Sequence, residues 1–178
     1  HPDYHAALIA NFILGGGTLN NYLNMNLREE HGYTYGAFSS IGADKYASRF
    51  KAEVAVRNAV TDSAVVETLK EVNRIKNELV NADQLKNAQA KYVGNFVMAL
   101  ENPATIARYA LNIKTEDLPQ DFYVNYLDKI NAVTAEDVLS VYNKYIKGRK
   151  AVILRVEREA NKDDDDDTPK SVNPHEND

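Results

Sequence analysis

The chain has 178 residues, of which 44% are hydrophobic and 26% are charged, a balance typical of one folded domain with a sizeable core. Eight acidic residues and two lysines lie in residues 159–178, so the net charge of −5 leaves about +1 on residues 1–158 and gives no support to nucleic-acid binding. The sequence has no cysteine, which excludes disulfides, thiolate metal sites and cysteine nucleophiles. No apolar run reaches the ~18 residues of a membrane span. Both a cytoplasmic and a periplasmic location fit this composition.

The chain is expected to begin with two helices. Residues 4–14 are predicted to form a mostly buried helix, because apolar residues recur there at helical spacing. The glycines at 15–17 are expected to stop it, since glycine tolerates the positive φ of a helix end. Thr18 is the expected N-cap of a second helix at roughly 19–30, which Gly32 ends.

Two alternating segments, residues 33–42 and 46–57, predict an antiparallel hairpin with a turn at 42–45. In the first strand, one face is expected to hold Tyr33, Tyr35, Ala37, Ser39 and Ile41. In the second strand, apolar residues alternate with charged ones. One face of the hairpin is therefore expected to be buried.

Helical patterns dominate the second half of the chain. The expected helices are about 62–79 after a Thr61 cap, about 82–101 after an Asn81 to Gln84 capping box, Pro103 to about 113, Pro119 to Ile130, and one that begins with a capping box at Thr134 and ends before Gly148. Residues 150–156 predict a final strand that is largely buried. The acidic stretch 159–178 predicts a disordered tail, because dense like charges repel.

This order of elements predicts an α+β fold, a two-layer α/β sandwich with a mainly antiparallel sheet and helices packed on one face. The folded domain is expected to span residues 1–158, followed by the acidic tail. Three strands make a thin sheet, so we expect further sequence upstream of residue 1 to supply another strand.

The histidines do not predict a metal site. His1 and His5 have the i, i+4 spacing of a helical zinc pair, but no glutamate lies between them, and surface histidines at a frayed end are favoured. His31 is expected at a solvated helix end, and His175 lies in the tail. The run at 15–18 opens a helix and lacks the Gly-Lys-Ser/Thr ending of a phosphate loop, so nucleotide binding is not favoured.

Arg28 and Tyr35 are the candidate functional pair. They lie seven residues apart, Arg28 near the end of a helix and Tyr35 on the following strand. On spacing alone they are more typical of a capping charge and a half-buried aromatic. However, NFILGGG from Asn11 to Gly17, followed by LREEHGYTY from Leu27 to Tyr35, resembles the second-domain signature of the M16 (pitrilysin, or insulinase-like) zinc metallopeptidases. The resemblance covers roughly residues 3–157.

The resemblance implies a division of labour. M16 members enclose a chamber with repeated α+β domains; one domain holds zinc through His-x-x-Glu-His, and another supplies an arginine and a tyrosine that reach the substrate. That pair matches Arg28 and Tyr35, whereas His-x-x-Glu-His is absent from this sequence. The resemblance therefore implies that this chain is a substrate-contacting domain that is inactive alone and has no cofactor of its own. Its implied partners are a zinc-bearing domain or subunit and a peptide substrate. A non-catalytic core subunit and a peptide-binding module are the alternatives.

Overall fold

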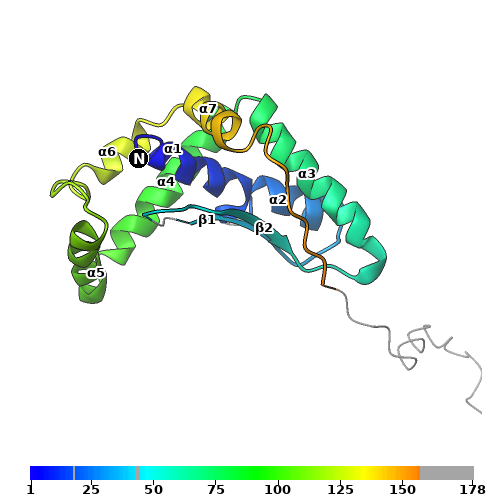
Figure 1. Ribbon diagram of the computed structural model, residues 1–178, viewed down its shortest axis with the longest axis horizontal. Helices are drawn as coiled ribbons and strands as arrows, with labels where there is room; N and C mark the ends of the chain where they lie inside the picture. The colour runs from blue at the N-terminus through cyan, green and yellow to red at the C-terminus, as the bar shows by residue number, and fades with distance from the viewer. Residues whose placement is uncertain (18, 43–44, 157–178) are drawn as a thin grey trace, which may run out of the picture.

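The computed structural model describes residues 1–17, 19–42 and 45–156, so the predicted acidic tail lies outside the described residues. Within them, helices lie on one side of a two-stranded antiparallel hairpin (Figure 1). This arrangement confirms the predicted α+β class with helices packed on one face of an antiparallel sheet.

The elements follow one another along the chain as α1 (Tyr4–Asn11), η1 (Phe12–Gly16), α2 (Tyr22–Asn24), η2 (Met25–Glu30), β1 (Ala37–Ile41), β2 (Phe50–Val54), η3 (Asn58–Val60), α3 (Thr61–Asn77), α4 (Ala82–Ala99), α5 (Pro103–Thr115), α6 (Tyr126–Asn131) and α7 (Ala135–Tyr145). The segments η1 and η2 are π-helical turns that continue α1 and α2, and η3 is a 3-10 turn. Among the described helices, none has the length and apolar character needed to cross a bilayer.

The first helix runs into a glycine whose role is close packing. A Cβ on Gly15 would lie 2.6 Å from Leu23 Cδ1 and 2.8 Å from the backbone nitrogen of Ser39. The helix continues through Gly16 and stops at Gly17, where φ is −96°. The predicted stop is therefore confirmed, but the predicted reason, a positive φ, is wrong. Glycine is needed here because a strand and a helix approach the backbone.

The second helix begins later than the sequence predicts. Asn21 is its N-cap, and the Asn21 side chain accepts the backbone N–H of Asn24 at 2.9 Å. The helix therefore starts at Tyr22 rather than at residue 19. The predicted cap, Thr18, lies outside the described residues.

The hairpin is shorter than predicted, with β1 and β2 paired from Ala37 opposite Val54 to Ile41 opposite Phe50. The alternation expected in both strands is present: apolar residues of β2 are partly buried while their neighbours are exposed, and β1 buries every second residue at its start. Residues 33–36 and 55–57 lie outside the strands. The predicted turn includes residues outside the described ones.

Local signals placed several later helices correctly. Asn102 caps α5, whose first residue is Pro103, and Thr134 forms the predicted capping box with Asp137 at the start of α7. Two other predicted caps, at Thr61 and at Gln84, are not formed as expected.

The Thr61 hydroxyl donates to the Arg57 carbonyl instead of capping α3.

The other exception is Gln84, which accepts the Tyr22 hydroxyl at 3.1 Å instead of completing a capping box with Asn81. Asn81 still caps α4 by accepting the Asp83 backbone N–H at 2.8 Å. The helix predicted from Pro119 is also shorter, because α6 begins only at Tyr126.

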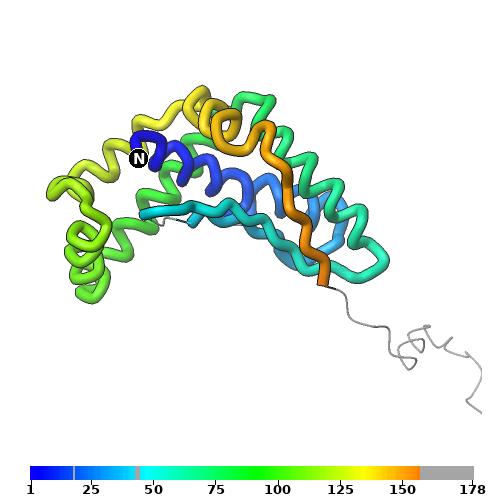
Figure 2. Tube along the Cα trace, viewed as in Figure 1, coloured from blue at the N-terminus to red at the C-terminus, as the bar shows by residue number. Residues whose placement is uncertain are grey.

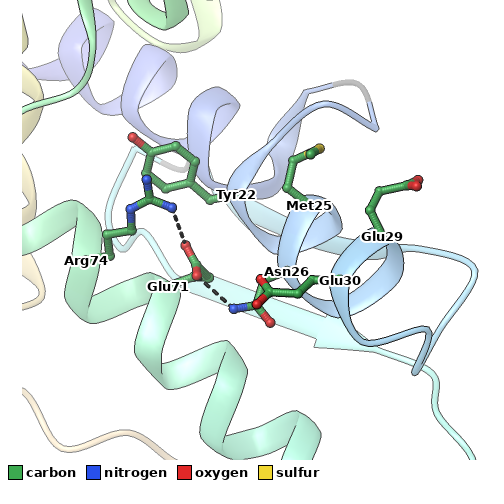
Figure 3. Close-up of a pocket in the computed structure, with 7 residues that line it drawn as sticks. All are labelled: Tyr22, Met25, Asn26, Glu29, Glu30, Glu71 and Arg74. Atoms are coloured by element: carbon green, nitrogen blue, oxygen red, sulfur yellow. Dashed lines mark hydrogen bonds and ion pairs between the residues drawn. The ribbon is translucent and has the colours of Figure 1, made fainter.

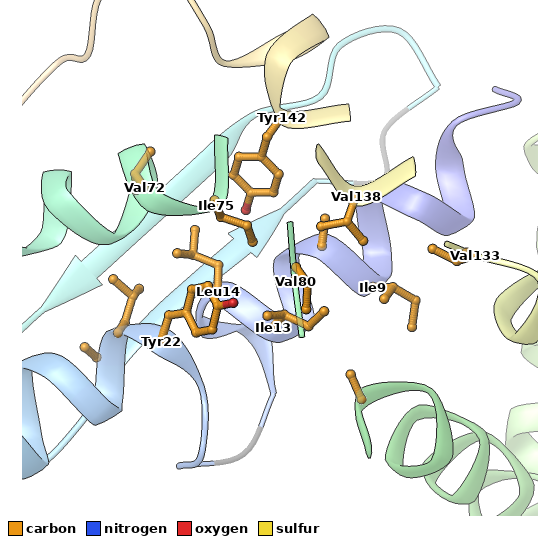
Figure 4. Packing of buried hydrophobic residues seen from close by; sticks show 14 of the residues in the cluster. Ile9, Ile13, Leu14, Tyr22, Val72, Ile75, Val80, Val133, Val138 and Tyr142 are labelled. Carbon is orange, nitrogen blue, oxygen red and sulfur yellow. The ribbon is translucent and has the colours of Figure 1, made fainter. Parts of the chain in front are cut away.

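The core lies around α1, which packs against α4, α6, α7 and β1. Figure 4 shows buried side chains from the two halves of the chain meeting there. The largest fully buried apolar and aromatic side chains are Tyr142, Ile9, Leu14, Leu23, Leu27, Ile75, Ile130 and Val138. Residues before the hairpin therefore depend on α3 and α7, far along the chain, for their burial.

The predicted final strand is wrong. Residues 150–156 are extended without strand pairing, and Val152, Leu154 and Val156 are 95%, 86% and 89% exposed. An ion pair between Arg155 and Asp62 joins the segment to α3. In Figure 2 the segment runs from α7 toward the end of the molecule opposite α5. Apolar sequence alone predicted burial here, but the described sheet provides no pairing for this segment.

Candidate functional site

Arg28 lies on the last turn of η2, immediately after the fully buried Leu27. Burial of Leu27 fixes this turn against the core, so Arg28 projects from an anchored element. The Arg28 side chain is 34% exposed, and its guanidinium lies 3.3 Å from the Glu29 carboxylate, which is itself 53% exposed. An ion pair between a partly exposed and an exposed side chain is worth little, so it leaves the guanidinium available to another acceptor.

A glycine turn links Arg28 to the tyrosine segment. The backbone N–H of Gly32 donates to the Arg28 carbonyl at 3.1 Å, and that of Tyr33 donates to the Leu27 carbonyl at 2.9 Å. Gly32 has φ of +61°, a conformation that favours glycine at a helix C-terminus. The predicted helix end at Gly32 is therefore confirmed, and the path of the chain out of η2 is fixed by hydrogen bonds.

Tyr35 does not lie on a strand, and its side chain is 97% exposed. The prediction that it shares a buried face with Ala37 and Ser39 is wrong, because β1 begins only at Ala37. Its flanks are nevertheless held. The Thr34 hydroxyl lies 2.7 Å from the Ala55 carbonyl, and the Gly36 N–H donates to that hydroxyl at 3.1 Å. Tyr35 is thus an exposed aromatic on a restrained backbone.

Within the described residues, no hydrogen bond or ion pair joins Arg28 to Tyr35. The structure places the two side chains on either side of the Gly32 turn but does not bring them into contact. Each retains hydrogen-bond donors for a third group: the guanidinium offers N–H groups and the phenol an O–H.

Buried asparagines support this region, and sequence reasoning missed them. Asn24 is fully buried and Asn26 is 4% exposed. Asn24 hydrogen-bonds to the backbone of Ala37, whereas Asn26 donates to Glu67 at 2.9 Å and to Glu71 at 2.8 Å. The sequence did contain a signal for them, because two polar asparagines lie between the buried leucines of an otherwise apolar helix.

A family model described as the peptidase M16 inactive domain matches residues 1–92. The chain belongs to the M16 inactive-domain family. A comparison with curated proteins finds no match. Its similarity to the M16 family therefore rests on the match to the family model, and solved structures of similar fold add to it.

Three solved structures illustrate the shared fold. The peptidase M16 inactive domain from Pseudomonas fluorescens has a TM-score of 0.75 and 23% identity, over 81% of this chain and 34% of that one. A protease from Helicobacter pylori has a TM-score of 0.74 and 17% identity, over 83% and 35%. A chain of complex III2 from Candida albicans, solved with Inz-5 bound, has a TM-score of 0.67 and 17% identity, over 81% and 36%. This M16 chain thus spans about a third of the length of each of these three relatives.

The M16 domain also has a pocket of about 330 Å³ between η2 and α3 (Figure 3). Its lining residues are Tyr22, Met25, Asn26, Glu29, Glu30, Glu71 and Arg74. The Arg74 guanidinium lies 4.4 Å from the centre of the Tyr22 ring and 3.4 Å from the buried Glu71 carboxylate. The Arg74–Tyr22 contact joins α3 to α2, and Glu71 also accepts Asn26 of η2 at 2.8 Å, so these side chains hold both elements against α3.

Next to this pocket, Glu67 links η2 and α3 from the other side. Its carboxylate accepts Lys70 at 2.9 Å and Asn26 at 2.9 Å, and these hydrogen bonds hold the pKa of the Glu67 carboxyl below its usual value. His31 Nε2 lies 3.6 Å from the same carboxylate, and the His31 ring stacks on Tyr33. The expectation of a solvated His31 is therefore only partly met.

The two histidines near the N-terminus lie in different surroundings. His1 is exposed, as predicted, but His5 is 8% exposed and packs among the rings of Tyr4, Phe122 and Tyr126, so the prediction of a surface histidine is wrong. Burial lowers the pKa of His5. Across the described residues, no group of three or more His, Cys, Asp or Glu side chains could hold a metal ion.

Proposed function

We propose that this M16 domain contacts the peptide substrate of a zinc metalloendopeptidase through Arg28 and Tyr35, while another domain or subunit holds the metal. Tyr35 gives the strongest support: it is 97% exposed, yet hydrogen bonds on both of its flanks restrain the backbone that carries it. An aromatic ring this exposed buries little apolar area against its own chain and so contributes little to its stability. Held in a fixed position, it is suited to contact a second molecule.

The chemistry of the pair suits peptide hydrolysis. Addition of water to a peptide carbonyl creates a tetrahedral intermediate whose oxygen carries negative charge. The Tyr35 hydroxyl and the Arg28 guanidinium are hydrogen-bond donors, and the guanidinium also carries positive charge. Directed at that oxygen, or at neighbouring substrate carbonyls, they stabilise the intermediate and position the peptide. Removing one donor of this kind typically lowers kcat by about 10²–10³.

Zinc is assigned to another domain because, among the residues that the structure describes, no group of three or more His, Cys, Asp or Glu side chains could hold a metal ion. The sequence has no His-x-x-Glu-His, and His5 is enclosed by aromatic rings. In the proposed enzyme, the metal supplies activation of the attacking water. The role of this chain is limited to its donors, so we expect it to be inactive alone.

The test is peptide cleavage by the complete enzyme, formed by combining the chain with its zinc-bearing domain or subunit. Arg28→Ala and Tyr35→Phe are each expected to lower kcat/KM by about 10²–10³ on an unstructured protein substrate. Arg108→Ala and Tyr46→Phe are matched controls, because both residues are exposed, on α5 and near the hairpin turn. The controls are expected to retain full activity.

A structural role is the second candidate, and the similarity of fold to a complex III2 chain favours it. A core subunit needs neither donor, so Arg28→Ala and Tyr35→Phe would leave assembly unchanged and no cleavage would depend on them. If both variants retain wild-type kcat/KM in a cleaving complex, the substrate-contact proposal is wrong. If the chain alone binds zinc stoichiometrically and cleaves peptides, the division of labour is wrong.

A further inference from the structure

Asn24 joins the helix that carries Arg28 to the segment that carries Tyr35. Its side-chain amide is fully buried and faces the backbone of Ala37. The Ala37 N–H donates to Asn24 Oδ1 at 2.9 Å, and Asn24 Nδ2 donates back to the Ala37 carbonyl at 2.9 Å. A side chain thus pairs with the first residue of β1 in the way that a neighbouring strand would.

The orientation of this amide is fixed from the helix side. Asn24 Nδ2 also donates to Asn21 Oδ1 at 3.1 Å, and the same Asn21 oxygen accepts the Asn24 backbone N–H at 2.9 Å. Both hydrogens of the Asn24 amide are therefore used, and its oxygen has a partner. A fully satisfied buried amide holds its partners in one arrangement.

Thr34 restrains the same segment from its other end. Its hydroxyl lies 2.7 Å from the Ala55 carbonyl beyond β2 and accepts the Gly36 N–H at 3.1 Å. Tyr35 therefore sits between a residue tied to the chain after β2 and a residue tied to α2. Arg28 lies one helical turn after Asn24 on the continuous helix of α2 and η2.

We propose that Asn24 and Thr34 are positioning residues that set the placement of Tyr35 relative to Arg28. This inference rests on the proposed function, because positioning has meaning only if the pair contacts substrate. The buried amide fixes the spacing between helix and strand, and the threonine fixes the path of the backbone between them. A displacement of about 1 Å in a catalytic arrangement can cost about 10² in rate.

The first measurement concerns the hydrogen bond itself. Asn24→Asp keeps an acceptor for the Ala37 N–H but loses the donor to the Ala37 carbonyl, and places a carboxylate beside that carbonyl and the Asn21 oxygen. Repulsion between the carboxylate and these two oxygens makes local opening at the start of β1 easier, so we expect amide exchange at Ala37 to become about five- to tenfold faster even though its acceptor is kept. The Gly42 N–H, bonded to Arg49 at the far end of the hairpin, is the control and should not change.

The second measurement separates positioning from simple stability. In the complete enzyme, Asn24→Asp is expected to lower kcat by about ten- to a hundredfold in the folded variant. In a Tyr35→Phe background the same substitution should cost much less, because the hydroxyl that it misplaces is already gone. Thr34→Val, at a partly exposed position, removes the second restraint without opening the core and should show the same coupling. It provides the test if Asn24→Asp does not fold.

Each outcome of these measurements either supports or overturns the inference. Faster exchange at Ala37 with coupling to Tyr35 supports the inference. Unchanged exchange at Ala37 overturns the restraint by Asn24, and an equal loss of kcat with and without the Tyr35 hydroxyl overturns positioning. If Tyr35→Phe itself leaves kcat/KM unchanged, the proposed function fails and this inference fails with it, whatever the exchange rate at Ala37.

Discussion

Gly15→Ala is expected to destabilise the protein even though it places a better helix former in a helical turn. The added methyl carbon would lie 2.6 Å from Leu23 Cδ1 and 2.8 Å from both the backbone nitrogen and the hydroxyl oxygen of Ser39. The leucine tip can move, but the backbone of β1 cannot move without disturbing the hairpin. Overpacking of this kind typically costs about 1–3 kcal/mol.

Gly94→Ala is the matched control, because Gly94 lies in α4 and a Cβ there meets nothing within 4 Å. Alanine gains about 0.5–1 kcal/mol over glycine inside a helix. In urea unfolding followed by circular dichroism, the midpoint urea concentration should therefore fall for Gly15→Ala and rise for Gly94→Ala. If both variants are stabilised, the close approach of β1 and α2 to Gly15 is wrong.

Burial lowers the pKa of His5 in the folded chain below its value of about 6.5 in the unfolded chain. As the pH drops below about 6.5, the unfolded chain therefore binds more protons than the folded chain, and the free energy of unfolding falls. The slope is at most about 1.4 kcal/mol per pH unit, and His5→Leu should flatten it in unfolding curves between pH 5 and 7. Thr134→Ala removes the cap of α7 and should cost about 0.5–2 kcal/mol in urea unfolding; a cost near zero would contradict the capping box. Leu154→Ser should change stability by less than about 0.5 kcal/mol, because Leu154 is 86% exposed; a large loss would mean that the segment is buried.

Local signals made much of the fold predictable. A proline after Asn102 and a threonine three residues before Asp137 each fix a helix start through contacts within one turn, and both predictions are confirmed. The Gly32 turn was predictable for the same reason. Such features depend on neighbours in the sequence, which the sequence displays directly.

The predictions that proved wrong concern residues whose surroundings come from distant parts of the sequence. His5 is buried because Phe122 and Tyr126 cover it, and nothing near residue 5 indicates this. Tyr35 fits an alternating pattern, yet strand pairing begins two residues later, where Asn24 takes up the backbone groups of Ala37. Arg28 and Tyr35 were identified through a family resemblance, and their roles in substrate contact stay a prediction.

The exposed segment 150–156 has a practical consequence for handling the protein. It combines three adjacent aliphatic residues, Val152 to Leu154, with Val156 close by, all of them at least half exposed. Short apolar stretches with free backbone groups pair readily with copies of themselves, and this drives aggregation. Only Lys150 and Arg155 interrupt the stretch with charge. Concentrated solutions are therefore expected to form β-rich oligomers, and mild denaturant or a second lysine in this segment should reduce them.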